Sequence, residues 1–181
     1  EWVDQLRRDF VKGEIKPAAP FVGGARDIVY GNDWWALEPD EAMVIEFEPP
    51  DARYWQIQLC DVWFRTMDWA TRQTGLNHAQ ARADRDGRVR VVIAHRDPGV
   101  QNWLDTGGHA EGMLQYRWIF TKNNPAPKAA IVPFERIRSA LPADTPAYSS
   151  EQRRATLAIR HRHLARREPV TRSCSMTSLV P

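Results

Sequence analysis

The fold is decided by the stretch Asp84–Trp118, which reads DRDGRVRVVIAHRDPGVQNWLDTGGHAEGMLQYRW. An Asp-Gly turn leads into an apolar run at 88–94, and a Gly-Gly turn leads into a second run at 113–120. Such turns between runs of β-branched and aromatic residues are strong signals for strands. We therefore predict two strands that flank a polar loop at 95–105, and we expect any functional site to lie at this loop.

Two further strands are predicted upstream of this stretch, at 41–48 and 53–59. Both runs alternate in polarity, as a half-buried strand does. The second run divides into two faces, with Trp55, Ile57 and Leu59 inward and Tyr54, Gln56 and Gln58 outward. The turn at 49–51 predicts that the two runs form an antiparallel hairpin. Shorter strand candidates lie at 26–30 and 34–37, whereas 60–76 follows no clear pattern.

Helical patterns flank the β-rich region. Apolar residues four apart predict a helix at 2–11, and a proline at the first turn predicts a short helix at 133–141. A capping box of Ser149 with Gln152 predicts the start of a last helix that reaches about Arg167. The predicted fold is mainly β, an antiparallel β-sandwich or jelly-roll core with an N-terminal helix and C-terminal helices. The predicted boundaries are 1–25 for the N-terminal helix and loop, 26–135 for the core, 136–167 for the C-terminal helices and 168–181 for a tail.

Composition excludes several classes of protein. With 181 residues, 43% of them hydrophobic and 27% charged, the chain has the profile of one soluble globular domain. A net charge of +2 argues against a dedicated nucleic-acid binder. No apolar run approaches the roughly 18 residues that a membrane span requires. The chain begins at Glu1 inside a helical pattern, which predicts that an upstream region precedes it.

The chain is rich in tryptophan, with eight residues. Tryptophan in a β-sandwich usually packs between the sheets, because its large side chain contributes much buried area. The alternative is that two or three of them line a pocket for a flat or apolar ligand such as a sugar, steroid or terpenoid.

Several short motifs occur in a fixed order: Tyr54-Trp55-Gln56, then Asp86-Gly87 before a strand, then Pro98 with Asn102-Trp103-Leu104, and finally Arg117-Trp118. Over roughly residues 26 to 135 this order resembles the domain-of-unknown-function 1214 (DUF1214) family. The resemblance implies a β-sandwich or jelly-roll core, often behind a longer N-terminal region or companion domain, and implies no particular activity. Many members have proline after Asn-Trp-Leu, whereas this chain continues Asp105-Thr106-Gly107-Gly108-His109, which makes the loop more acidic and more flexible.

The candidate catalytic residues are Asp97, Asp105 and His109, beside Trp103. General acid–base catalysis requires a carboxylate or histidine in a partly dry cleft, and these side chains would meet that requirement. Aspartates in turn-rich loops more often accept hydrogen bonds from backbone N–H groups, and we regard this as the commoner role for Asp97 and Asp105.

The same loop contains residue types that bind metals. His95 with Asp97, and Asp105 with His109, could form a set of two histidines and a carboxylate. The His-x-His spacing usual at cupin metal sites is missing, because Asp97 stands where the second histidine would be. We expect no metal and no cofactor. No GxSxG elbow occurs, and Cys60 at the end of an apolar strand is expected to be buried and inert.

The candidate ligand-binding residues are Trp55, His95, Asn102, Trp103 and Arg117. For Asn102 and Arg117 we favour structural roles. The Asn102 amide can join two loop backbones, and a buried Arg117 would need a partner such as Asp86, Asp97 or Asp105.

We predict a small-molecule-binding or accessory domain that holds an apolar or sugar-like ligand in an aromatic-lined pocket, with no nucleic-acid partner. One alternative is a hydrolase or lyase that uses Asp97, Asp105 and His109. Another is an assembly module that forms a homo-oligomer, in which the basic C-terminal helix docks on an acidic neighbouring subunit.

Overall fold

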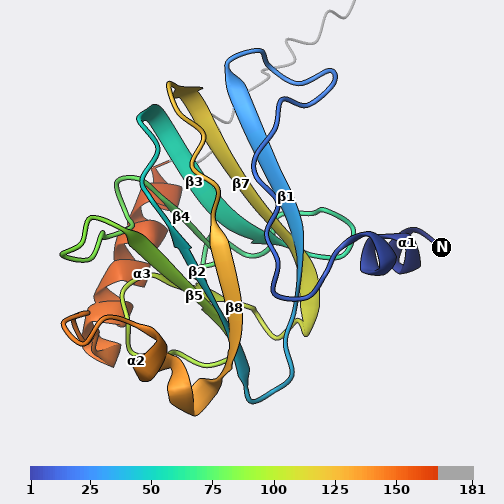
Figure 1. Ribbon diagram of the computed structural model, residues 1–181. Helices are drawn as coiled ribbons and strands as arrows, with labels where there is room; N and C mark the ends of the chain where they lie inside the picture. The colour runs from blue at the N-terminus through green and yellow to red at the C-terminus, as the bar shows by residue number, and fades with distance from the viewer. Residues whose placement is uncertain (167–181) are drawn as a thin grey trace, which may run out of the picture.

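The chain folds into two facing β-sheets of four strands each, which confirms the predicted mainly β sandwich (Figure 1). The computed structural model describes residues 1–166. Sheet A has the strand order β1-β7-β3-β4, and sheet B has the order β6-β5-β2-β8. The strands of sheet A are β1 (Ile28–Ala36), β7 (Glu111–Thr121), β3 (Ala52–Cys60) and β4 (Gly75–Asn77). Those of sheet B are β6 (Trp103–Asp105), β5 (Val89–Ala94), β2 (Glu41–Phe47) and β8 (Lys128–Pro133).

Strand β7 is the longest strand of sheet A and pairs antiparallel with both β1 and β3. In sheet B, β2 pairs antiparallel with β5 and β8, while β5 and β6 run parallel. The short strand β6 had no signal of its own in the sequence, since it falls within the predicted loop 95–105. The two short candidates at 26–30 and 34–37 belong to the single strand β1, which continues through Gly31.

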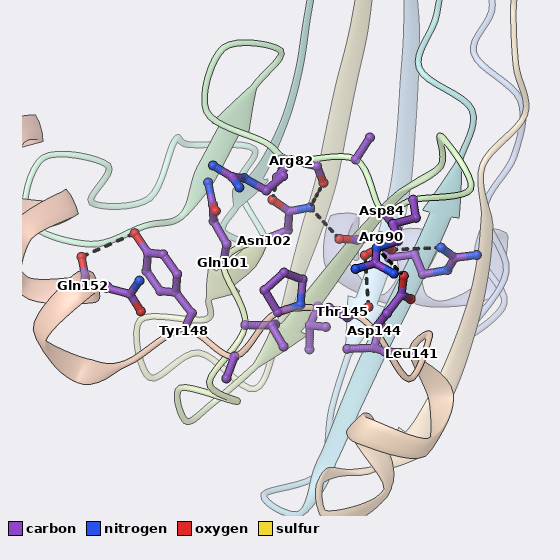
Figure 2. A pocket seen from close by; sticks show the side chains of 16 residues that line it. Arg82, Asp84, Arg90, Gln101, Asn102, Leu141, Asp144, Thr145, Tyr148 and Gln152 are labelled. Carbon is purple, nitrogen blue, oxygen red and sulfur yellow. Dashed lines mark hydrogen bonds and ion pairs between the residues drawn. The ribbon is translucent and has the colours of Figure 1, made fainter.

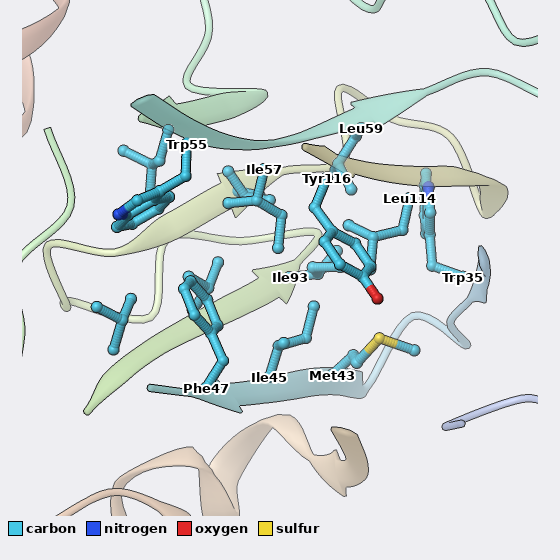
Figure 3. Packing of buried hydrophobic residues seen from close by; sticks show 14 of the residues in the cluster. Trp35, Met43, Ile45, Phe47, Trp55, Ile57, Leu59, Ile93, Leu114 and Tyr116 are labelled. Carbon is cyan, nitrogen blue, oxygen red and sulfur yellow. The ribbon is translucent and has the colours of Figure 1, made fainter. Parts of the chain in front are cut away.

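The core lies between the sheets and is rich in aromatic side chains (Figure 3). Trp55 and Phe47 meet edge to face with ring centroids 5.3 Å apart, and Trp118 lies 5.5 Å from Phe47 and 4.8 Å from Tyr116. Burying an aromatic side chain removes roughly 200 Å² from water, which at about 25 cal/mol/Å² contributes about 5 kcal/mol. Five of the eight tryptophans are buried, so the core role predicted for this residue type is confirmed for the majority.

The predicted hairpin of 41–48 with 53–59 is wrong, because β2 belongs to sheet B and β3 to sheet A. The connection contains Pro49 and Pro50, which have no backbone N–H and cannot extend a ladder. The chain therefore turns from one sheet to the other at this corner, and the two strands face each other across the core.

Helices cover the outer faces of the sandwich. Helix α1 (Trp2–Asp9) packs Val3 and Leu6 on one end of sheet A, beside Trp34 and Met113. The 3-10 helix η1 (Phe134–Arg136) and α2 (Ile137–Ala140) cover the outer side of sheet B.

The last helix, α3 (Ser150–Ala165), begins with the predicted capping box between Ser149 and Gln152. The predicted tail at 168–181 lies outside the described residues. Within residues 1–166, no helix has the length and apolarity that crossing a membrane requires.

Candidate functional site

The outer face of sheet A, which points away from sheet B, carries two rows of polar side chains. Strand alternation places every second residue of β1, β7, β3 and β4 on this side, and the register aligns them across the strands. One row is Asn32, Gln115 and Gln58, ending at Gly75, and the other is Tyr30, Arg117, Gln56 and Asn77. We call these two rows the polar face.

Hydrogen bonds link much of the polar face into a chain. The Tyr54 hydroxyl donates to Gln56 Oε1 over 2.9 Å, and the Gln56 amide donates to Gln58 Oε1 over 3.5 Å. The Gln58 amide donates to Gln115 Oε1 over 3.1 Å, and the Gln115 amide donates to Asn32 Oδ1 over 3.4 Å. Gln56 thus keeps one N–H and one carbonyl lone pair for another partner.

A pocket of about 640 Å³ opens over the β3–β4 end of the polar face. Its floor includes Gln56 and Gln58, and Gly75 leaves room there because it has no side chain. Helix α3 forms one wall with Arg160, whose guanidinium donates to the Gly75 carbonyl over 2.7 Å. The ring of Trp69, which is 45% exposed, lines the pocket from the loop between β3 and β4. Polar donors and acceptors therefore line the floor, and an aromatic ring stands at the rim.

Arg117 lies in the middle of the polar face, opposite Gln56 in the ladder and over the Tyr30 ring at 5.3 Å. The expectation that Asp86, Asp97 or Asp105 pairs with Arg117 is wrong. These carboxylates pair instead with Arg90, Arg153 and Arg72, respectively. The reason is topological, since Arg117 points outward from sheet A.

Asp97 is tied to α3. Its two carboxylate oxygens accept hydrogen bonds from Arg153 over 3.0 and 3.3 Å, and one of them also caps the Gly99 N–H over 2.9 Å. Arg153 is 5% exposed and stacks over the Trp103 ring at 5.0 Å. This arrangement fixes the loop to the helix and matches the structural role favoured for the aspartate.

Asp105 is also engaged on both oxygens, by Arg72 over 2.9 Å and by the Gly107 N–H over 2.8 Å. Asp97, Trp103 and Asp105 do come together, along an open pocket of about 400 Å³ beside the start of α3. His109 is exposed and does not line that pocket, so the three candidate catalytic residues are not gathered around one space.

Two predicted ligand contacts are structural by position. Trp55 is 5% exposed in the core, where rings of the protein itself occupy its neighbourhood. Trp103 is buried and donates its indole N–H to the Ala94 carbonyl over 3.0 Å. Trp55 packs between the sheets, whereas Trp103 packs on the outer side of sheet B and lines the open pocket beside α3. Their assignment to a ligand pocket stays a prediction.

His95 bridges two segments, with Nδ1 2.9 Å from the Thr106 hydroxyl and Nε2 3.1 Å from the Leu37 carbonyl. It also lines an open pocket of about 580 Å³ with Glu38 and Glu111. Both ring nitrogens of His95 have hydrogen-bond partners, so the residue acts as a link between two loops.

Asn102 lies in a pocket of about 500 Å³ between the loop and the segment before α3 (Figure 2). Its amide donates to the carbonyls of Arg82 and Arg90 over 2.6 and 2.9 Å, and its oxygen accepts from the Arg82 N–H over 2.9 Å. Both N–H groups are used, so the structural role favoured for Asn102 accounts for it. Nearby, Asp84 is held by Arg90 and Thr145, so the charged groups of this pocket neutralise one another (Figure 2).

Across residues 1–166, no three histidine, cysteine, aspartate or glutamate side chains are placed to hold a metal ion. Cys60 is buried beneath α1, and burial raises the pKa of its thiol. A thiol in that setting is a poor nucleophile.

The polar face was missed as a site although the sequence contained a signal for it. The outward residues of 53–59 are Tyr54, Gln56 and Gln58, which are polar but uncharged. Side-chain amides both donate and accept hydrogen bonds, so a run of them on one face suggests hydrogen bonding to a partner. The contributions of Asn32, Gln115 and Gly75 depend on long-range pairing and had no local signal.

Solved structures place the fold among known proteins. An uncharacterised protein from Burkholderia cenocepacia is 32% identical to the chain over 77% of its length, with a TM-score of 0.68. The match covers 39% of that protein, so the chain spans well under half of its length. The match to the VPA0106 protein from Vibrio parahaemolyticus covers 56% of this chain and 30% of that protein. The two are 11% identical over the match, with a TM-score of 0.44. No curated protein matches the chain.

The resemblance to the DUF1214 family is wrong as an assignment, because a different family model, a protein of unknown function termed DUF1254, matches residues 10–163. Several of the motifs behind the resemblance have structural positions in this β-sandwich. Trp55 and Trp118 fill the core, and Asp86-Gly87 turns the chain before β5. Because this family model matches most of the chain, the chain belongs to the DUF1254 family.

Proposed function

We propose that this chain is a small-molecule-binding domain whose ligand lies in the pocket between the polar face and α3. The observation that carries the proposal is the hydrogen-bonded chain Tyr54, Gln56, Gln58, Gln115 and Asn32. Side-chain amides donate and accept hydrogen bonds at once, which suits a ligand with many hydroxyl groups. A sugar-like molecule is the class that we favour.

Two further features support the proposal. The pocket volume of about 640 Å³ falls within the range of small-molecule sites, which is roughly 300–1,000 Å³. The Trp69 ring stands at the rim, where the apolar face of a sugar ring could stack on it.

The alternatives from the sequence have less support. A hydrolase or lyase that uses Asp97, Asp105 and His109 would need free carboxylates, yet both aspartates accept hydrogen bonds from arginine. Helix α3 directs Arg153 and Arg160 at its own chain, which leaves fewer of its basic residues for a neighbouring subunit. Both alternatives stay predictions.

The proposal is tested by titrating the 181-residue chain with a panel of neutral and acidic mono- and disaccharides, using calorimetry and saturation-transfer NMR. We expect at least one sugar to bind with a Kd below about 1 mM, which corresponds to about 4 kcal/mol.

Trp69→Ala should weaken this binding about tenfold or more, because stacking on an aromatic ring is lost. The matched control is Trp63→Ala, since Trp63 is exposed in the same connection but does not line the pocket. A panel in which no sugar binds, or in which both tryptophan variants behave alike, would overturn the proposal.

A further inference from the structure

Arg117 and Arg160 are partly buried, and they differ from Arg90 and Arg153 in their partners. Arg90 and Arg153 are each paired with at least one carboxylate. Within residues 1–166, neither Arg117 nor Arg160 lies within 4.0 Å of a carboxylate oxygen, and each has a buried Nε without a hydrogen-bond partner. A buried Nε–H group without a hydrogen-bond partner is costly, and neither guanidinium has a countercharge to offset that cost, so these two residues require an explanation.

Among residues 1–166, no aspartate or glutamate lines the pocket over the polar face. The lining residues within that range include Arg160 and His163. Each of the three other pockets described above contains two carboxylates: Asp84 and Asp144, Asp97 and Asp105, or Glu38 and Glu111. The pocket is therefore distinguished by unopposed positive charge as well as by its amides.

The second cation lies beside the pocket floor. Arg117 does not itself line the pocket, but it is the cross-strand neighbour of Gln56, whose side chain does. Both residues point outward, because they occupy paired positions of antiparallel strands. Burial lowers the pKa of Arg160, and the positive charge of Arg153 lowers it further. A bound anion would offset both effects, because it would stabilise the charged guanidinium.

We propose that the ligand is an anionic saccharide, whose carboxylate, sulfate or phosphate group is bound by Arg117 and Arg160 while its hydroxyls meet the amides of the polar face. This inference rests on the proposed function and narrows its ligand class. Arginine suits the role because its planar guanidinium presents a fork of donors to an oxyanion. The amides supply the uncharged part of the recognition.

The test compares sugars that differ only at C6: D-glucose with D-glucuronate, D-galactose with D-galacturonate, and glucose 6-phosphate or glucose 6-sulfate as further arms. We expect at least one acidic sugar to bind the 181-residue chain about tenfold or more tightly than its neutral twin. Raising NaCl from about 50 to 500 mM should reduce that preference, because salt screens the charge. The arm with the largest preference identifies the anionic group.

Arg160→Gln and Arg117→Gln should each reduce the preference for the acidic sugar to about twofold or less. Binding of the neutral twin should change by less than about threefold, because the amides and Trp69 remain. The matched control is Arg162→Gln, since Arg162 is exposed on the same helix and does not line the pocket. It should keep the full preference.

Stability gives an independent readout. Arg117→Gln removes a cation that has no carboxylate partner, so the ligand-free variant should melt no lower than the wild-type chain. A Tm several degrees lower would show that Arg117 stabilises the fold, for example through its contact with the Tyr30 ring, and would overturn the inference. Equal binding of acidic and neutral twins would also overturn it while leaving the proposed function intact, whereas failure of every sugar to bind would remove both.

Discussion

Arg153 is predicted to be the side chain that fastens α3 to the sandwich. It is 5% exposed and donates to both oxygens of Asp97, to the Gln101 carbonyl over 3.2 Å and to the Val100 carbonyl. Its guanidinium also lies 4.7 Å from the centre of the Tyr148 ring. Replacing it with methionine keeps much of the apolar stem and removes all of these hydrogen bonds.

The expected cost of Arg153→Met follows from the partners left behind. Breaking a buried ion pair costs about 3–5 kcal/mol, and the lower end applies to this pair because the Asp97 side chain keeps 32% of its exposure. The two carbonyls that lose a donor add about 1 kcal/mol together. We therefore expect the free energy of unfolding to fall by about 4 kcal/mol.

Urea titration followed by tryptophan fluorescence measures this change, with an unchanged m value as the check on two-state unfolding. The matched control is Arg154→Met, because Arg154 is the exposed neighbour on the same helix and should change stability by less than about 0.5 kcal/mol. Adding Asp97→Asn completes a double-mutant cycle, in which we expect a coupling of about 2 kcal/mol or more. If Arg153→Met and Arg154→Met cost the same, Arg153 does not fasten the helix and the reasoning is refuted.

Two more predictions concern β1. Gly31→Ala should destabilise the chain by about 3 kcal/mol, because the new Cβ would overlap the ring of Tyr116. Gly75→Ala should cost less, since the nearest atom to its new Cβ would be 3.1 Å away. Equal losses of stability in urea titration would contradict this prediction. Burial raises the pKa of Asp33 to about 6, above its unfolded value of 3.8, so the folded state retains a proton that the unfolded state releases. Stability should therefore fall by about 3 kcal/mol as pH rises from about 4 to 7, and Asp33→Asn should remove this decline; an unchanged pH profile in the variant would count against it.

The inward and outward faces of individual strands could be predicted from the sequence. Within 53–59, the alternation assigned Trp55 to the core and Gln56 to the outer face, and both assignments are confirmed. The capping box at Ser149 was equally readable, because its two partners are three residues apart. These features depend on neighbours in the chain, which is why composition and spacing were enough.

Strand pairing was harder to predict from the sequence. A short connection between two alternating runs usually means a hairpin, yet β2 and β3 separate into different sheets at Pro49 and Pro50. Both patterns have the same local signature, and which one forms depends on how the two sheets close over the core. Strand β6 is a similar case, because its pairing with β5 is defined by tertiary position and not by its own composition.

The prediction of a site at the loop 95–105 relied on residue types that are common in both structural and functional roles. Asp97 and Asp105 are each held by an arginine from a distant part of the chain, Arg153 and Arg72, and no local pattern indicates these partners. Once the partners are known, the loop is explained as a junction between α3 and the sheets. Chemically suggestive residues were thus engaged in holding the fold.

The sequence by itself determined the mainly β class, the strand positions around Val89–Ala94 and Glu111–Thr121, and the two faces of the runs 41–48 and 53–59. The faces follow from the two-residue period of a strand. Only the tertiary structure decided that Asn32, Gln58 and Gln115 form one row, and that Arg117 and Arg160 stand near it without carboxylate partners among residues 1–166. The physical reason is that a row of side chains across a sheet is set by the register between strands far apart in sequence. That register is fixed by packing of the whole core and has no signature within any single strand.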